Sequence, residues 1–362
     1  MFQPTFRVVS SAYATGLPPS SGHPSASRSF PHLDFCCAGY CGDAGGRVQV
    51  EIEMPFFNYL PAYELNRSPR ILAAFDTDFL RNLDAFRRSL RQGERFTLLL
   101  QTGWSVLVPT FAEELKTRMV EAHRMFPEAR IVFLVNEKEA IPILKDSAEC
   151  VWCHQNAFLD PGRYPLATGA RRFDAIYVAR ITPFKRHALA AKVPNLHLVG
   201  AHSIRETDYF QEIMRTVPHA RWDEKVNSWL IGRRMAQASC GLALSSTEGA
   251  MFVCGEYSLC GIPVVNTANI GGRDLMLPEF SAFHAEDTPE SVAEGVEHWK
   301  SNPVPPQAIR EAFLRMAAEH RTCLDDLLAS IAGKRIKVPH KLGIRCRLLP
   351  HQKLLHGLRR RG

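Results

Sequence analysis

Short apolar runs alternate with longer amphipathic segments along most of this chain. Residues 96–100 and 130–135 are continuous apolar runs, as is typical of strands that are covered on both faces. Residues 110–126 repeat apolar positions at helical spacing, and residues 48–54 alternate like a half-buried strand. The same pattern predicts further strands at 149–152, 174–178, 196–199, 241–244 and 263–266, and helices at 79–90, 185–192, 208–217, 229–239, 251–260 and 306–332.

The alternation of strands and helices predicts parallel βαβ units in an α/β fold. Prolines and glycines gather at residues 156–172, which makes this segment the best linker candidate. We therefore expect two α/β domains, an N-terminal one over residues 47–160 and a C-terminal one over residues 170–333. Ligands of such folds bind at the carboxyl ends of strands and in the cleft between domains.

The two ends of the chain differ from its body in composition. With 362 residues, 46% of them hydrophobic, the chain is long enough to bury two cores. Residues 1–46 include a stretch rich in proline, serine and glycine, which predicts an irregular or disordered segment, or a start codon placed too early. Residues 334–362 form a basic tail with ten Lys or Arg and no Asp or Glu.

Charge and cysteine usage limit the classes of function. Removing the ten tail cations from the net charge of +7 leaves −3 for residues 1–333, so we expect no nucleic acid partner for the body of the protein. No run reaches the ~18–20 apolar residues of a membrane span, and residues 1–31 lack the apolar core of a signal peptide. The ten cysteines are scattered, which favours reduced thiols in a cytoplasmic protein.

The segment that carries chemistry follows the strand predicted at 241–244. Glu248 lies in a glycine-containing loop, and Glu256 lies eight positions later in the helix that this loop enters. The two carboxylates are therefore spaced to contact opposite ends of one ligand. The free amides of Ala250 and Met251 at the start of the helix make an anion site. A nucleoside diphosphate sugar fits, because it offers a diphosphate to the amides and a ribose diol to a carboxylate.

Two cations follow the strand predicted at 174–178. Arg180 and Lys185 come at its carboxyl edge. Arginine contacts phosphate through two parallel hydrogen bonds, and lysine supplies a point charge. Neutralising a diphosphate leaving group is the main electrostatic demand of glycosyl transfer, so these two side chains are candidates for that role.

Together these motifs resemble glycosyltransferase family four, whose members are retaining enzymes of GT-B fold, with two Rossmann-like domains facing a central cleft. The family signature consists of two glutamates separated by seven residues and followed by Gly-x-Pro-Val-Val. In this chain Glu248 and Glu256 have that spacing, and residues 261–265 resemble the Gly-x-Pro-Val-Val part. The remaining matches are the Arg-x-x-x-x-Lys of Arg180 and Lys185, the linker motif at residues 156–160, and the glycine pair Gly271 and Gly272.

The resemblance implies a glycosyltransferase, similar to hexosyltransferases, that moves a sugar with retention from a nucleotide-sugar donor to a saccharide or other hydroxyl acceptor. It implies catalytic roles for Arg180 and Lys185, which would bind the diphosphate, and for Glu248, which would contact the transferred sugar. It implies no cofactor and no metal ion, because side chains and helix amides supply the positive charge. The other donor-binding residues would be Glu256, on the ribose hydroxyls, and Gly249, Ala250 and Met251.

The sequence departs from the family in two places. The family has Phe-Gly where this chain has Ala250 and Met251, which leaves the donor sugar open. The N-terminal domain has no evident glycine-rich loop after its first strand, which leaves the acceptor open. Two alternatives therefore stand beside the transferase: a catalytically inactive nucleotide-sugar-binding or scaffold protein of GT-B fold, and another GT-B enzyme such as an epimerase or a phosphorylase.

Asp76-Thr77-Asp78 has the Asp-x-Asp form used by metal-dependent glycosyltransferases, in which two carboxylates hold a divalent ion. The tripeptide is short and lies far in sequence from the donor motifs. An N-cap for a helix that begins near residue 79 is the favoured interpretation. We therefore assign no metal site.

Cys150, Cys153 and His154 match the haem-attachment pattern, and the two cysteines also match a thioredoxin-like pair. Joined with Cys36, Cys37 and Cys41 they would make an irregular zinc pattern. Coincidence is the favoured interpretation of each. We retain His154 only as a candidate for an acceptor-side base.

Leucines are interleaved with the cations of the basic tail, and Leu354, Leu355 and Leu358 fit one helical face. One hypothesis is that this segment rests on an anionic membrane surface, where each Lys or Arg contributes about 1 kcal/mol. The protein would then be peripheral on the inner face of the membrane, beside a lipid-linked acceptor of polysaccharide biosynthesis. A disordered, solvated tail has equal weight, and nucleic-acid binding by the tail is a third option.

Overall fold

The computed structural model describes residues 62–90, 93–224, 226–227 and 230–336, and all of them belong to one compact unit of the chain. Four predictions lie outside the described residues: those for the segment 1–46, the strand at 48–54, the three cysteines at 36, 37 and 41, and the tail beyond residue 336.

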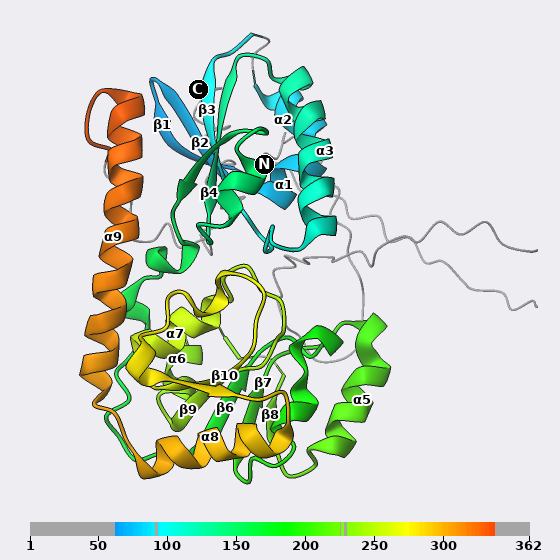
Figure 1. Ribbon diagram of the computed structural model, residues 1–362, viewed down its shortest axis with the longest axis vertical. Coiled ribbons are helices and arrows are strands. Elements are labelled where there is room, and N and C mark those ends of the chain that lie inside the picture. The colour runs from blue at the N-terminus through cyan, green and yellow to red at the C-terminus, as the bar shows by residue number, and fades with distance from the viewer. Residues whose placement is uncertain (1–61, 91–92, 225, 228–229, 337–362) are drawn as a thin grey trace, which may run out of the picture. The chain divides into compact units, whose positions relative to one another are not determined.

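The first half of the described chain forms a five-stranded sheet with the order β1-β2-β3-β4-β5 (Figure 1). β1 and β2 are antiparallel, whereas β2 to β5 run parallel. The strands are β1 (Tyr63–Arg67), β2 (Arg70–Phe75), β3 (Phe96–Gln101), β4 (Ala129–Val135) and β5 (Glu149–Trp152). The helices are α1 (Asp76–Arg81), α2 (Leu83–Ser89), α3 (Pro109–Met125) and α4 (Ala140–Leu144). The predictions for 96–100, 110–126, 130–135 and 149–152 are confirmed, within a residue at each end.

The single helix predicted at 79–90 is wrong, because the segment is divided between α1 and α2 at Asn82. Asn82 has φ −125° and ψ 27°, and its side-chain amide donates to the carbonyl of Asp78 (2.8 Å). Such local hydrogen bonds of asparagine compete with helix continuation. Phe79 and Phe86 are nevertheless fully buried. The pattern therefore predicted which residues are buried and missed the break.

The second half forms a six-stranded parallel sheet with the order β11-β10-β9-β6-β7-β8. The strands are β6 (Phe173–Val178), β7 (Leu196–Val199), β8 (Arg221–Asp223), β9 (Ala238–Ala243), β10 (Val264–Thr267) and β11 (Ala282–Ala285). The helices are α5 (Thr207–Thr216), α6 (Ile231–Met235), α7 (Phe252–Cys260), α8 (Pro289–Ser301) and α9 (Pro306–Ala332). The two α/β sheets confirm the predicted fold class.

Two helix predictions in this half are wrong. Residues 185–192 form two 3-10 helices, Pro183–Lys185 and His187–Ala190, because Arg186 between them has the left-handed φ of 52°. The helix predicted at 229–239 is reduced to α6, and β9 takes over from Ala238. β8, β11 and α8 were not predicted. The two strands are short, and β11 is only half buried, so neither has a clear apolar pattern.

The strand order of the second sheet reverses at β6. From β6 the chain continues to β7 and β8 on one side, and then returns to place β9 and β10 on the other. The loops that leave β6 and β9 therefore diverge at adjacent carboxyl ends. In open parallel sheets this switch point is where ligands bind. The segments with Arg180 and Lys185 and with Glu248 are the ones that leave these two strands.

Candidate functional site

Helix α7 is fixed against the switch point by Tyr257. The Tyr257 hydroxyl donates to the carbonyl of Ile176 (3.2 Å) and accepts from the amide of Val178 (3.0 Å), both in β6. Gly241 of β9 makes room for the ring, because a Cβ at this position would overlap it. Helix α7 is therefore tied through its second half to the two strands that flank the switch point.

Lys185 and Glu248 form a direct ion pair at the carboxyl ends of these strands. Each side chain is only 12% exposed, so water screens the pair little. The carbonyl of Lys185 accepts from the hydroxyl of Tyr177 (2.6 Å). Burial and the nearby charge of Glu248 raise the pKa of Tyr177 well above its ordinary value, so Tyr177 stays a neutral donor. The structure thus brings together two of the three residues predicted to be catalytic.

Arg180, the third, is half-buried two residues beyond β6. Its charge acts on Glu206. Burial tends to raise the pKa of Glu206, but hydrogen bonds with Thr182 and Ser203 and the charge of Arg180 lower it below its ordinary value. The two predicted diphosphate ligands therefore each lie near a carboxylate: Lys185 pairs with Glu248, and Arg180 lies near Glu206.

The loop between Glu248 and α7 is tightly packed. A Cβ on Gly249 would lie 3.2 Å from the backbone of Trp104, and Ala250 is buried. The side-chain amide of Asn156 donates to the carbonyl of Ala250 (2.9 Å). Met251 adopts the left-handed φ of 42°, where glycine is normally favoured. The position at which the sequence departs from the family pattern is therefore one of unusual backbone conformation.

Glu256 lies in the middle of α7 and is fully buried. Its Oε1 accepts from the hydroxyl of Tyr164 (3.0 Å), a residue of the segment between the two sheets. The structure therefore leaves Glu256 without solvent-exposed surface, whereas Glu248 is partly accessible. Contact with a ribose would require the side chains that cover Glu256 to move.

The loop after β10 packs against the Glu248 loop through glycines. Gly271 has φ 122°, and a Cβ there would overlap the carbonyl of Glu248, while a Cβ on Gly272 would meet the carbonyl of Gly249 at 2.5 Å. A short parallel bridge joins Thr247 to the same loop at Ile270. Only glycine allows this approach, so the predicted Gly-Gly match has a physical reason.

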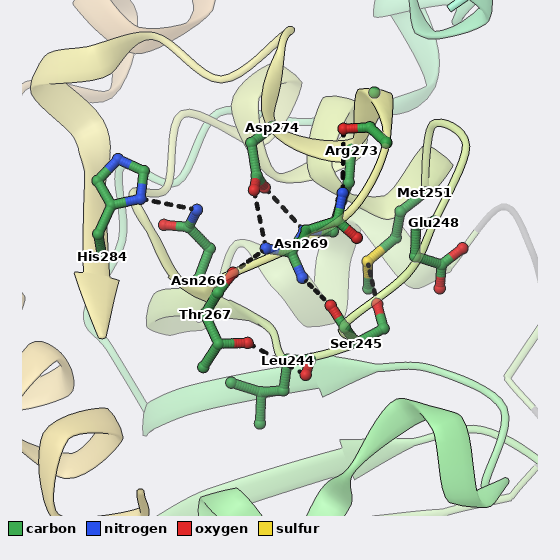
Figure 2. Close-up of polar contacts among 12 residues, drawn as sticks. Leu244, Ser245, Glu248, Met251, Asn266, Thr267, Asn269, Arg273, Asp274 and His284 are labelled. Carbon is green, nitrogen blue, oxygen red and sulfur yellow. Dashed lines mark hydrogen bonds and ion pairs between the residues drawn. The ribbon is translucent and has the colours of Figure 1, made fainter. Parts of the chain in front are cut away.

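Two arginines at this site were not predicted from the sequence. Arg273 is fully buried, donates to the backbone carbonyls of Ser245 and Thr267, and pairs with Asp274 (2.7 Å), as Figure 2 shows. Arg186 lies beside Lys185 in sequence and also reaches Thr267. Both could have been singled out by their position in the sequence, because Arg186 directly follows Lys185 and Arg273 directly follows Gly272.

His154 is not available as a base, so that candidate is wrong. Its Nδ1 accepts from the amide of Asn156 (3.1 Å), so the ring proton must be on Nε2, which donates to the carbonyl of Gly272 (2.9 Å). Complete burial lowers the pKa of His154 to about 3. Both nitrogens are therefore used in fixing the backbone.

The interpretation of residues 76–78 as an N-cap for a helix that begins near residue 79 is also wrong, because all three lie inside α1 and its N-cap is Phe75. Asp76 is the first residue of α1, and its Oδ1 accepts from the amides of Thr77 (2.6 Å) and Gly103 (3.0 Å). It thereby ties the end of β2 to the loop after β3. Burial raises the pKa of Asp76 to about 7. Within the described ranges, His, Cys, Asp and Glu do not gather in groups of three or more that could hold a metal ion.

Cys150 and Cys153 are free thiols with separate partners. Cys150 donates to the carbonyl of Ala148 and Cys153 to that of His320, each at 3.4 Å. Burial raises the pKa of Cys150 to about 11 and that of Cys153 further. Both therefore stay protonated and unreactive near neutral pH.

The fold is GT-B, as the two sheets and the solved structures similar to this chain show. HepE from Anabaena, in complex with UDP and glucose, is 15% identical with a TM-score of 0.55, and the match covers 72% of this chain and 77% of HepE. Sucrose-phosphate synthase from Thermosynechococcus elongatus is 14% identical with a TM-score of 0.50, over 73% and 72% of the two chains.

A TarM variant from S. aureus, in complex with fondaparinux, α-GlcNAc-glycerol and UDP, is 13% identical with a TM-score of 0.55, over 71% of this chain and 54% of TarM. This chain therefore spans about half the length of TarM. The chain matches no protein-family profile and no curated protein sequence. Among the helices of the described residues, none has both the length and the apolar character needed to cross a membrane.

Proposed function

We propose that this protein is a retaining glycosyltransferase that moves a sugar from a nucleotide-sugar donor to a hydroxyl of a saccharide acceptor. The observation that carries the proposal is the partly accessible Lys185–Glu248 pair at the switch point, beside the start of α7. The solved structures with this fold add support, since HepE and TarM were both determined with UDP.

In the proposed reaction the bond between the sugar's anomeric carbon and the diphosphate oxygen breaks, and the acceptor oxygen bonds to that carbon on the same face. The acceptor's proton leaves with the nucleoside diphosphate. Lys185 and Arg180 would stabilise the charge that grows on the leaving diphosphate. Glu248 would accept hydrogen bonds from the sugar hydroxyls. We assign no protein nucleophile, and the proposal needs no metal ion, because these cations and the amides at the start of α7 supply the positive charge.

Glu256 is proposed to accept from the ribose hydroxyls, as the family resemblance implies. Complete burial of Glu256 sets the condition, because the side chains that cover this carboxylate must shift before a ribose can reach it. We also propose a location and an acceptor for this protein. A cytoplasmic protein whose basic tail contacts an anionic membrane would meet a lipid-linked acceptor. Cosedimentation with anionic vesicles, for the full chain and for a chain ending at Gly333, tests this contact.

The test of the function is a nucleotide screen followed by product analysis. We expect UDP or GDP to raise the melting temperature, since a ligand at 100 times its Kd stabilises by about 2.7 kcal/mol. The corresponding nucleotide sugar, incubated with saccharide acceptors, should give an α- or β-linked product whose anomeric configuration matches the donor by NMR. Nucleotide binding without turnover would favour the inactive binding protein. An epimerised donor, or a reaction that requires inorganic phosphate, would favour the other GT-B enzymes.

A further inference from the structure

Two arginines and one threonine join the carboxyl ends of β9 and β10. Arg186 donates through Nη2 to Thr267 Oγ1 and through Nε to the carbonyl of Leu244, both at 2.6 Å. Arg273 donates to the carbonyls of Thr267 and Ser245 (Figure 2). The Thr267 hydroxyl itself donates to the carbonyl of Leu244 (3.1 Å). We call Arg186, Arg273 and Thr267 the arginine clamp.

Each arginine of the clamp is matched by a carboxylate. Asp274 accepts from Nε (2.7 Å) and Nη2 (2.8 Å) of Arg273, and Asp287 accepts from Nη1 of Arg186 (2.7 Å). Burial opposes the charge of Arg273, but Asp274 raises the pKa of Arg273 above its ordinary value, so the guanidinium stays ionised. Both charges are compensated, and the other hydrogen bonds of the two side chains go to backbone carbonyls and to the Thr267 hydroxyl. These arginines are therefore suited to hold loops rather than a diphosphate.

The clamp anchors the backbone next to both members of the ion pair. Arg186 directly follows Lys185 and holds a left-handed conformation, which a residue other than glycine keeps only where its surroundings fix it. Ser245 lies three residues before Glu248. Between them the loop is paired with Ile270, which donates to the carbonyl of Ser246 (2.8 Å) and accepts from the amide of Glu248 (3.2 Å).

We propose that the three residues of the arginine clamp are positioning residues. They hold the Lys185 ammonium where it can contact the donor's diphosphate and the Glu248 carboxylate where it can contact the donor's sugar. The inference rests on the proposed function. It predicts that loosening the clamp weakens nucleotide binding through Lys185, without any clamp residue touching the nucleotide.

The test uses Thr267→Val, which keeps the shape of the side chain but removes the hydroxyl that bonds Arg186 and Leu244. We expect Thr267→Val to raise the Kd for UDP, measured calorimetrically, about tenfold. Thr267→Ser keeps a hydroxyl, so its Kd should stay within about twofold of the wild-type value. Hydrogen exchange should become faster in peptides covering residues 183–187 and 244–251. Thr216→Val is the matched control, because the Thr216 hydroxyl only donates to the carbonyl of Glu212 within α5 (2.9 Å).

A merely structural role is separated by repeating Thr267→Val in a Lys185→Gln background. If the clamp acts through Lys185, adding Thr267→Val to the Lys185→Gln variant should change the Kd for UDP by less than about twofold. An equal loss in both backgrounds, or an unchanged Kd with a lowered melting temperature, would overturn the proposal. If the wild-type chain binds neither UDP nor GDP, the proposed function fails. The exchange measurement still decides the clamp in that case, because unchanged exchange at 183–187 and 244–251 overturns it.

Discussion

Glu248→Gln should tighten the binding of free UDP while it reduces sugar transfer. In UDP the sugar is missing, so the Glu248 carboxylate only competes with the diphosphate for the Lys185 ammonium. Both side chains are 12% exposed, so their charge-assisted hydrogen bond is worth about 1.5–3 kcal/mol. The Lys185 ammonium has three hydrogens, so it keeps part of its bond to Glu248 when it also binds the diphosphate, and UDP displaces only the remainder. We therefore expect Glu248→Gln to strengthen UDP binding by about 1.4 kcal/mol, which is a tenfold decrease in Kd.

Calorimetric titration of UDP into wild type, Glu248→Gln, Lys185→Gln and the double variant measures this competition. With Lys185 already replaced, Glu248→Gln should change the Kd less than about threefold. Glu128→Gln is the control, because Glu128 precedes β4, pairs with the exposed Arg95 and alters the net charge by the same amount when replaced. The reasoning is refuted if Glu128→Gln tightens UDP binding as much as Glu248→Gln, or if the gain persists without Lys185.

Four further predictions concern the same protein. Arg180→Ala should lower turnover about 10²–10³-fold at saturating donor, measured by product formation, and near-normal turnover would remove Arg180 from the diphosphate. Glu256→Gln should weaken UDP binding about tenfold, whereas Tyr164→Phe should not, and equal calorimetric affinities for wild type and Glu256→Gln would contradict the ribose contact. Transfer should survive excess EDTA, and loss that a divalent ion restores would count against a metal-free site. Because burial raises the pKa of Asp76 from 3.8 to about 7, the folded state keeps a proton that the unfolded state has lost, so wild type loses stability as pH rises from 4 to 7. Urea unfolding at pH 5 and 8 should show roughly 3 kcal/mol of this loss in wild type, and Asp76→Asn should remove it.

The elements that could be read from the sequence are those whose burial is continuous or strictly periodic. β3 and β4 are covered on both faces, so their apolar runs are unbroken and their bounds follow directly. The segment 185–192 has helical composition, but the hydrogen bonds of Arg186 to Leu244, Thr267 and Asp287 fix a left-handed residue at its second position. These partners are 58 to 101 positions away, and no local pattern encodes them.

Some features of the candidate site could also be predicted from the sequence, whereas others depend on packing. Lys185 and Glu248 stand out in the sequence because each follows an apolar strand and belongs to a motif. The burial of Glu256 against Tyr164 and the use of both His154 nitrogens depend on side chains brought together by packing, and they altered what the motif alone suggested.

The α/β class, most strands and the two segments that leave β6 and β9 can be predicted from the sequence, because they depend on local periodicity and on motif spacing. Only the folded protein shows that β6 and β9 are neighbours at the switch point, that Lys185 pairs with Glu248, and that Arg186 and Arg273 meet at Thr267. Sheet order and buried charge pairs arise from contacts between distant residues, whose energies depend on geometry and desolvation rather than on neighbouring residues in the chain.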